Sequence, residues 1–271
     1  MSASKQTIAF FGATGGCACA ALAAALRNGH TCTALARTPD KLRNMLTTTH
    51  LIPATTLDSQ LTIHAGDVKD SSAVQKVLTL PSNPSVLVDT ILFGVGSTPA
   101  LQWSIMQPVT LTDPTLCEVG MSTVLSTLSC LTESGVSTTA YGKKPFIITI
   151  STTGISDGKR DVPYLLYPLY HWLLQVPHVD KKKAEQLLVN DKGANSRDFV
   201  IIRPTLLTDG AARGLGKVRV GWEWGVRKET QEKELGPALG WTVGRTDVGE
   251  FIFREVVVKG GWEGKCVTLT Y

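Results

Sequence analysis

The sequence of 271 residues predicts an α/β fold, with a doubly wound parallel sheet covered by helices on both faces. Three observations support this prediction. Short, almost wholly apolar segments, each of the length of one buried strand, alternate with segments of helical character. A glycine-rich turn follows the first apolar segment. Glycine or polar residues follow the later ones, at positions that a parallel sheet brings to a single edge.

The glycine-rich turn lies between an expected strand, 7–11, and an expected helix rich in Ala and Leu, 19–26. Its spacing is Gly12-x-x-Gly15-x-x-Ala18. Gly12 permits a tight turn, Gly15 lets the backbone approach a phosphate, and Ala18 lets the helix pack on the strand. The N–H groups of the helix N-terminus attract an anion. The turn therefore predicts the pyrophosphate site of a Rossmann-type dinucleotide fold, formed by Gly12, Thr14, Gly15, Gly16 and Cys17.

Cys17 in this turn has two interpretations. A helix N-terminus lowers the pKa of a nearby thiol, which would make Cys17 reactive. The simpler interpretation, which we favour, is that a small residue fits the turn. The six cysteines show neither a CxxC pair nor the spacing of a metal site, so we expect reduced thiols and no bound metal.

The composition narrows the classes of function. Hydrophobic residues make up 43% of the chain and the net charge is +4, without a basic stretch interleaved with aromatic residues. We therefore expect a globular protein that does not bind nucleic acid. The first residues lack the apolar region of a signal peptide, which predicts a cytoplasmic protein. The length predicts a single domain, 1–271, with substrate-side insertions near 98–113, 155–178 and 210–240.

The end of the second expected strand, 31–36, decides the cofactor. An acidic residue at this position binds the ribose 2′-hydroxyl of NAD, whereas an arginine accommodates the 2′-phosphate of NADP. The residue is Arg37, which predicts NADP(H); a solvated loop arginine is the alternative. Thr38 and Pro39 suit the N-cap and first position of the next helix, and Thr38 is a second candidate ligand of the phosphate. The Thr-rich stretch 47–60 is expected to be a loop.

The next two expected strands, 61–65 and 86–93, also end in candidate ligands. Asp67 follows the first strand, with Val68 beside it. Either Asp67 binds the adenine amino group, or it caps the helix expected at 70–78. Glycines follow the second strand and let the backbone lie against a flat ligand. The candidates there are Gly94, Val95 and Gly96.

Three further strands are expected at 145–150, 199–202 and 267–270. The first runs into Ser151 and the second into Pro204 and Thr205, all in the expected ligand groove. Helices are expected before the first and before the last of these strands, at 113–134 and 247–257.

Two stretches do not follow the alternation of strands and helices. The apolar stretch 162–174 is too short to span a membrane, and it forms either a wall of the substrate site or part of the core. The stretch 217–227 alternates and contains Trp222 and Trp224, which predicts a hairpin that acts as a lid or as an interface strand.

Taken together, these motifs resemble the atypical short-chain dehydrogenase/reductases, in particular the NmrA-like, NAD(P)H-binding group that includes isoflavone reductase-like enzymes. The resemblance covers most of the chain. It implies the fold and the cofactor class but not the substrate, because the group includes reductases, isomerase-like enzymes and redox-sensing regulators. The insertions are similar to those of fungal members, many of them near secondary-metabolite genes. The residues that carry the resemblance are 12–16, Arg37, 65–68, Asp180, Lys181, Ala184, Glu185, 199–204 and 245–250.

In typical short-chain dehydrogenases, a Ser and a Tyr-x-x-x-Lys pair perform the chemistry, with the Lys lowering the pKa of the Tyr. The resemblance implies that Ser151 or Thr153 takes the place of the Ser and Lys181 that of the Lys. Pro177 stands where the Tyr would be, and no shift of register restores the pair. This departure puts ordinary ketone reduction in doubt.

Three sources of the catalytic proton remain open. His178 stands four residues before Lys182, and a protonated imidazole is an effective acid near neutral pH. Alternatively, a tyrosine of the preceding stretch reaches the site. In the third case the acceptor is conjugated and water supplies the proton. The candidate tyrosines are Tyr164, Tyr167 and Tyr170.

The leading hypothesis is an NADPH-dependent oxidoreductase that reduces a small apolar molecule, aromatic or of polyketide type. We expect a monomer or homodimer without a membrane or nucleic-acid partner. Its apolar pocket would be walled by Tyr167, Tyr170, Trp172, Trp222 and Trp224. A redox sensor that binds NADP(H) without turnover is one alternative, and the missing Tyr favours it. A non-redox isomerase, cyclase or dehydratase on the same fold is another.

Overall fold

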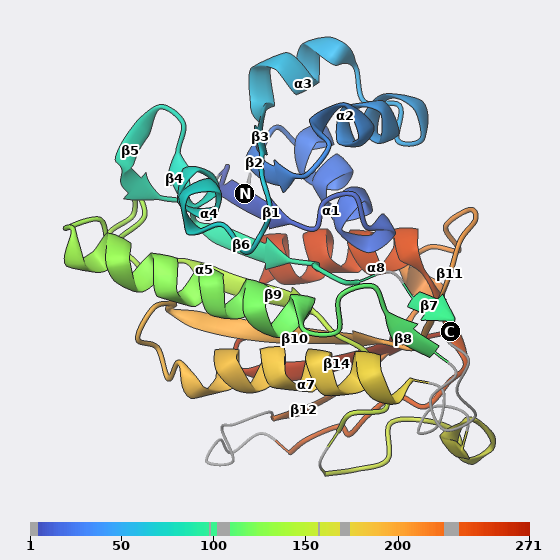
Figure 1. The fold of residues 1–271 in the computed structure, drawn as a ribbon. Coiled ribbons are helices and arrows are strands. Elements are labelled where there is room, and N and C mark those ends of the chain that lie inside the picture. Colours follow the sequence, from blue (N-terminus) through green and yellow to red (C-terminus); the bar gives the residue numbers. More distant parts are fainter. Residues whose placement is uncertain (1–4, 98, 102–108, 157, 169–173, 225–232) are drawn as a thin grey trace.

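A computed structural model describes residues 5–97, 99–101, 109–156, 158–168, 174–224 and 233–271 (Figure 1). Its main sheet has eight strands. These are β1 (Thr7–Phe11), β2 (Thr31–Ala36), β3 (Leu61–Ala65), β6 (Thr90–Phe93), β9 (Phe146–Ile150), β10 (Asp198–Pro204), β12 (Arg219–Trp224) and β14 (Lys265–Thr270). They lie in the order β12-β14-β10-β9-β6-β1-β2-β3, and only β12 runs antiparallel to its neighbour.

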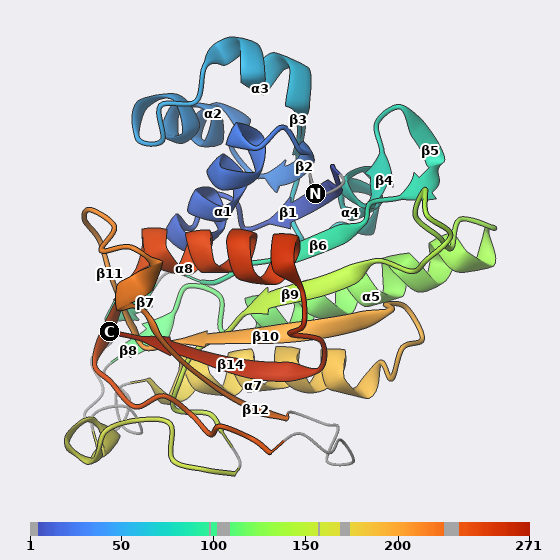
Figure 2. The same ribbon diagram turned by 180° about the vertical axis from the view of Figure 1, so that it is seen from behind.

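Helices cover both faces of the sheet (Figures 1 and 2). One face carries α1 (Gly16–Arg27), α2 (Pro39–Thr48), α3 (Ala54–Gln60) and α8 (Arg245–Phe251), which continues as a π-helix over Ile252–Lys259. The other face carries α4 (Ser71–Leu78), α5 (Leu116–Glu133) and α7 (Gln175–Asn190).

The strands alternate between two separate cores. In β1, Ile8 and Phe10 belong to the core under α1 and α8, while Ala9 and Phe11 belong to the core under α4 and α5. All four are fully buried, because a parallel strand between two helical layers meets apolar side chains on both sides. The doubly wound α/β fold expected from the apolar segments is thereby confirmed.

Two local predictions are wrong. The stretch 47–60 is not a loop: it holds the end of α2 and all of α3, because Leu57 anchors that short helix in the core. The stretch 86–93 is not one strand. Its first part belongs to a hairpin of β4 (Thr79–Leu80) and β5 (Asn83–Leu87), and only β6 joins the main sheet. The carboxylate of Asp89, between β5 and β6, accepts a hydrogen bond from the N–H of Thr7 at 2.8 Å.

The stretch 217–227, expected as a hairpin that acts as a lid or as an interface strand, is described only in part, and in that part β12 pairs along its length with β14 at the edge of the sheet. Beyond β12, the segment 236–238 crosses this edge. Gly221 permits the crossing, because a Cβ there would lie 2.1 Å from the backbone nitrogen of Ala238. The N–H of Gly236 donates to the carbonyl of Trp222 at 2.9 Å. Residues 225–232 lie outside the described part of the chain.

The three expected insertions are only partly described. Near 98–113, β7 (Pro99–Leu101) pairs antiparallel with β8 (Val109–Leu111). Near 155–178, a short 3-10 turn covers Tyr164–Leu166, and Tyr170 and Trp172 lie outside the described residues. Near 210–240, the chain passes from β11 (Leu206–Thr208) through β12 to β13 (Thr242–Gly244), which pairs parallel with β11. Within the described ranges, no helix is long and apolar enough to cross a bilayer.

Candidate cofactor-binding site

The glycine turn packs backbone against backbone with the loop after β6. Gly12 adopts a φ of +76°, and a Cβ on it would lie 2.6 Å from the carbonyl oxygen of Gly94. The N–H of Gly94 donates to the carbonyl of Phe11 at 2.8 Å. Only glycine suits such a contact, because any side chain would push the ends of β1 and β6 apart.

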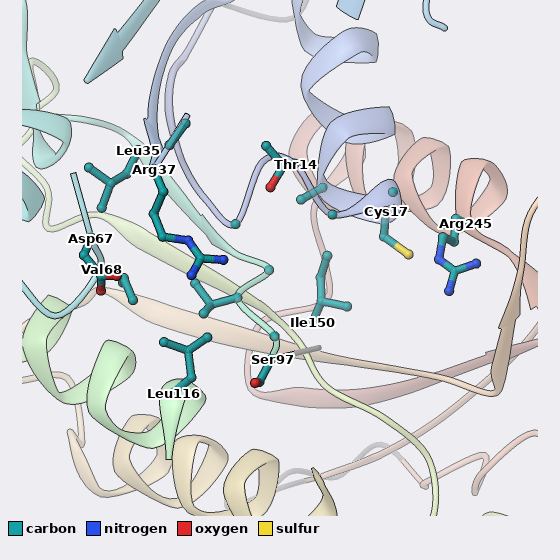
Figure 3. A pocket seen from close by; sticks show the side chains of 18 of the residues that line it. Thr14, Cys17, Leu35, Arg37, Asp67, Val68, Ser97, Leu116, Ile150 and Arg245 are labelled. Atoms are coloured by element: carbon teal, nitrogen blue, oxygen red, sulfur yellow. The ribbon is translucent and has the colours of Figure 1, made fainter. Parts of the chain in front are cut away.

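A cavity of about 500 Å³ opens at this edge of the sheet (Figure 3). The glycine turn lies at its centre, the end of β2 on one side, and the ends of β6 and β9 on the other. Most of the residues expected to bind the cofactor line it: Gly12, Thr14, Gly15, Gly16, Cys17, Arg37, Asp67, Val68, Gly94, Val95, Gly96, Ser151 and Lys181.

At the end of β2, Arg37 and Lys41 both line the cavity. The residue that caps α4 is Asp70, not Asp67: the Asp70 carboxylate accepts from the N–H of Ser72 at 2.8 Å. The carboxylate of Asp67 accepts from the N–H of Lys69 at 2.9 Å, and Asp67 remains in the cavity wall.

The N-terminus of α1 points its free N–H groups at the cavity without a side-chain cap, since its N-cap residue is Gly15. Cys17 in the first turn is buried. Burial raises the pKa of its thiol to about 12, although the positive charges of Arg245 and Lys181 act in the opposite direction. The thiol is therefore neutral at physiological pH, which favours the interpretation of Cys17 as a small residue that fits the turn.

Ser151 and Lys181 meet at the ends of β6 and β9. The ammonium of Lys181 donates to the carbonyl of Val95 at 2.7 Å and to that of Ile150 at 2.8 Å. The N–H of Ser151 is fixed by the carbonyl of Ile202 at 2.7 Å. Its hydroxyl oxygen is buried and has no hydrogen-bond partner among the described residues. A buried hydroxyl that lines a cavity without a partner is available to a ligand.

Buried charges hold α7, which carries Lys181, against the sheet. The Asp180 carboxylate accepts from the N–H groups of Cys117 and Glu118 at the start of α5, at 3.0 and 2.9 Å. The Arg203 guanidinium on β10 pairs with Glu185 of α7 at 2.6 Å and with Glu223 of β12 at 2.8 Å. Together these contacts fix the height of α7 over the cavity.

Several predicted site residues do not line this cavity. The hydroxyls of Thr153 and Thr205 donate to the carbonyls of Pro204 and Leu269, at 3.4 and 3.3 Å. Thr38 is the N-cap residue of α2, although its side chain makes no capping hydrogen bond. The described predicted residues outside the cavity wall are Thr38, Thr153, Tyr167, His178, Lys182, Pro204 and Thr205.

The two tryptophans expected to wall an apolar pocket pack elsewhere. The ammonium of Lys265 lies 4.2 Å from the ring centroid of Trp222 and 5.1 Å from that of Trp224. These cation–π contacts tie β12 to β14 at the far edge of the sheet from the nucleotide turn.

Sequence reasoning missed two basic residues of the wall, Lys41 and Arg245. Lys41 lies in the first turn of α2, which begins at Pro39 directly after the end of β2, so it stays near Arg37. Arg245 belongs to a segment that carries the family resemblance, but only the packing of α8 on α1 brings it to the glycine turn.

Two fungal proteins match this chain along its length. The reductase pytE of Aspergillus terreus is 41% identical over 282 residues, with 100% of both chains covered. The oxidase pynE of Aspergillus niger is 39% identical over 292 residues, with 98% of this chain and 99% of that protein covered. The chain belongs to their family. No established family model matches this pytE/pynE-type sequence, so its NmrA-like grouping stays a prediction.

The fold of this pytE/pynE-type chain also matches solved structures. A Rossmann-fold NAD(P)-binding family protein from Shigella flexneri superposes with a TM-score of 0.56, covering 98% of this chain and 94% of that one at 15% identity. At such low identity the match establishes the fold alone, and it confirms the Rossmann-type architecture.

Proposed function

We propose that this protein is an NADPH-dependent reductase that acts on a small apolar molecule, aromatic or of polyketide type. The observation that carries the proposal is one cavity. It has the glycine turn at its centre, Arg37 and Lys41 at one end, and Ser151 and Lys181 at the other. The names of the two fungal relatives, a reductase and an oxidase, support redox chemistry.

The residues present suit a dinucleotide. A Cβ on Gly12 or Gly94 would lie within 3 Å of its neighbours, and the close-packed glycine backbone of this turn suits a phosphate chain. The uncapped N-terminus of α1 offers N–H donors to that chain. The unpartnered hydroxyl of Ser151 offers a hydrogen bond at the opposite end.

Two cations at the end of β2 favour NADP over NAD. The guanidinium of Arg37 points into the cavity (Figure 3), and Lys41 lines the same end. A guanidinium binds a phosphate through two hydrogen bonds, and an ammonium nearby adds a second charge. The 2′-phosphate of NADP meets both groups, whereas the 2′-hydroxyl of NAD leaves their charges uncompensated.

The nicotinamide end combines apolar walls with few polar groups. Ile150 lines this end beside Ser151, and Val95, Leu116 and Leu207 are further apolar residues of the cavity wall. When bound, the reduced cofactor supplies a hydride to an electron-poor carbon. Ser151 donates a hydrogen bond to the substrate carbonyl oxygen and stabilises the negative charge that develops there. Lys181 holds the ends of β6 and β9 together and adds positive charge beneath them.

Water is the proton source that best suits this cavity. Neither His178 nor Tyr167 lines the cavity, and its described wall contains no tyrosine or histidine. A conjugated acceptor suits these groups. Hydride addition to it gives an enolate, whose oxygen Ser151 stabilises and which water then protonates. We therefore propose enones and quinones as the first substrates to try.

The cofactor preference is tested by titrating the wild type and Arg37→Gln with NADPH and NADH. We expect Arg37→Gln to weaken NADPH binding by about tenfold to a hundredfold and NADH binding by less than about threefold. Arg43→Gln is the matched control, because Arg43 lies on α2 in an exposed pair with Asp58, outside the cavity. Equal loss of both cofactors in Arg37→Gln would remove the 2′-phosphate role.

Turnover is tested by NADPH oxidation with a panel of quinones and enones. Steady oxidation with at least one acceptor is the expected result. Tight NADPH binding without turnover on any acceptor would favour a sensor. Product formation without NADPH consumption would favour an isomerase, cyclase or dehydratase.

A further inference from the structure

Arg245, the first residue of α8, lies directly over the glycine turn. A Cβ on Gly16 would lie 2.5 Å from its Cδ atom, so the arginine side chain runs across the start of α1. The helices touch again one turn later, where a Cβ on Gly249 would lie 2.7 Å from the carbonyl oxygen of Cys17. The close packing of α8 on α1 therefore holds Arg245 at the cavity wall, beside Cys17 (Figure 3).

The basic residues of the described cavity wall lie at different places along it. Arg37 and Lys41 belong to the end of β2, and the ammonium of Lys181 is engaged by two carbonyls. A pyrophosphate on the glycine turn carries about two negative charges, and the turn itself supplies only N–H dipoles. Arg245 is the cation that this wall holds against the turn.

The present partner of Arg245 is a weak one. Its guanidinium pairs with the carboxylate of Asp209 at 2.8 Å, and the Asp209 side chain is 89% exposed. Such a surface pair contributes little stability, because water screens it. A pyrophosphate offers the guanidinium more charge and two-oxygen hydrogen bonding on a less solvated site.

We propose that Arg245 binds the pyrophosphate of the dinucleotide and that Asp209 is the counter-ion from which it is drawn when the dinucleotide binds. The inference rests on the proposed function, whose dinucleotide supplies the anion. It assigns opposite effects to the two members of one ion pair. Loss of Arg245 weakens the binding of ligands that contain a pyrophosphate, whereas loss of the Asp209 charge strengthens it.

Calorimetric titration with three ligands tests the proposal. NADP⁺ contains the pyrophosphate and the 2′-phosphate, ADP-ribose only the pyrophosphate, and adenosine 2′-monophosphate only the 2′-phosphate. We expect Arg245→Gln to weaken NADP⁺ and ADP-ribose by about tenfold to a hundredfold and the monophosphate by less than about threefold. Asp209→Asn should bind NADP⁺ and ADP-ribose about two- to fivefold more tightly.

Arg254→Gln is the matched control, because Arg254 continues the same helix in an exposed pair with Glu250. It should leave all three affinities unchanged. Unchanged ADP-ribose affinity in Arg245→Gln, equal weakening of all three ligands, or weaker binding by Asp209→Asn would each overturn the proposal. Wild-type protein that binds neither NADP⁺ nor ADP-ribose would overturn the proposed function itself. If Arg245→Gln does not fold, the sign of the Asp209→Asn effect alone decides.

Discussion

The half of the sheet proposed to bind the nucleotide and the half proposed to face the substrate, here the nucleotide side and the substrate side, are held together by different forces. Around β1, β2 and α1 the contacts are apolar, and the loops meet through glycine backbone. Around β9, β10 and α7 the contacts include buried charges: Arg203 with Glu185 and Glu223, and Asp180 on the start of α5. Backbone packing tolerates almost no substitution at a few glycines, whereas a charged network distributes the positioning over several side chains.

The largest effect on ligand binding is expected on the nucleotide side, from Gly12→Ala. The added methyl group meets the Gly94 carbonyl, and the positive φ is unfavourable for alanine. We expect a loss of about 2–4 kcal/mol in unfolding free energy and of at least about a hundredfold in NADPH affinity. Denaturant unfolding and calorimetry measure these.

Gly135→Ala separates the effect of the positive φ from that of the contact with Gly94. Gly135 also has a positive φ, +92°, but nothing lies within 4 Å of its Cβ position. We expect a cost of about 1 kcal/mol and unchanged NADPH affinity. Equal effects of the two substitutions would show that backbone strain, not the contact with Gly94, governs the turn.

On the substrate side, Arg203→Met should affect stability and spare the nucleotide. It leaves Glu185 buried without its partner and Glu223 with only the Ser156 hydroxyl, which costs about 3–5 kcal/mol of unfolding free energy. The affinity for adenosine 2′-monophosphate should change by less than about threefold, because the end of β2 does not depend on this network. A large loss of that affinity would mean that the two sides are not independent.

Lys181→Met gives a smaller effect at the boundary of the two sides. It removes two hydrogen bonds from an ammonium to carbonyls, which predicts a loss of about 2–3 kcal/mol and a fall in turnover with little change in the affinity for adenosine 2′-monophosphate. Lys183→Met is the control, since Lys183 lies on the same helix as Lys181 and makes only an exposed pair with Glu118 of α5. Thermal unfolding and turnover of the two variants should therefore differ clearly.

The smallest effect concerns His30, on the nucleotide side. Burial lowers the pKa of its imidazole below 6.5, while its Nδ1 accepts from the N–H of Gln6. As the pH falls, the His30 imidazole is therefore protonated in the unfolded chain before it is protonated in the folded one. Its contribution to the free energy of unfolding is complete above about pH 6.5 and is lost as the pH falls below that value, by less than about 1 kcal/mol. His30→Asn should flatten this part of the pH profile of melting temperature, and an unchanged profile would contradict the prediction.

The two sides also differ in how far sequence predicts them. The glycine turn, Arg37 and the alternation of buried strands with helices are predictable, because each follows from a local pattern with a physical cause. Arg245 is not, because the long-range packing of α8 on α1 brings it to the cavity. Only some of the catalytic candidates line the cavity. Ser151 and Lys181 do, whereas His178 and Lys182 lie elsewhere on α7.

The crossing of segment 236–238 over Gly221 has a consequence for self-association. Unpaired edge strands recruit other chains, and proteins avoid this by covering them. The covering segment bonds to β12 through the N–H of Gly236, which closes that end of the sheet to a second strand. A dimer that continued the sheet across β12 would have to displace this segment, whereas β3 forms the opposite end of the sheet.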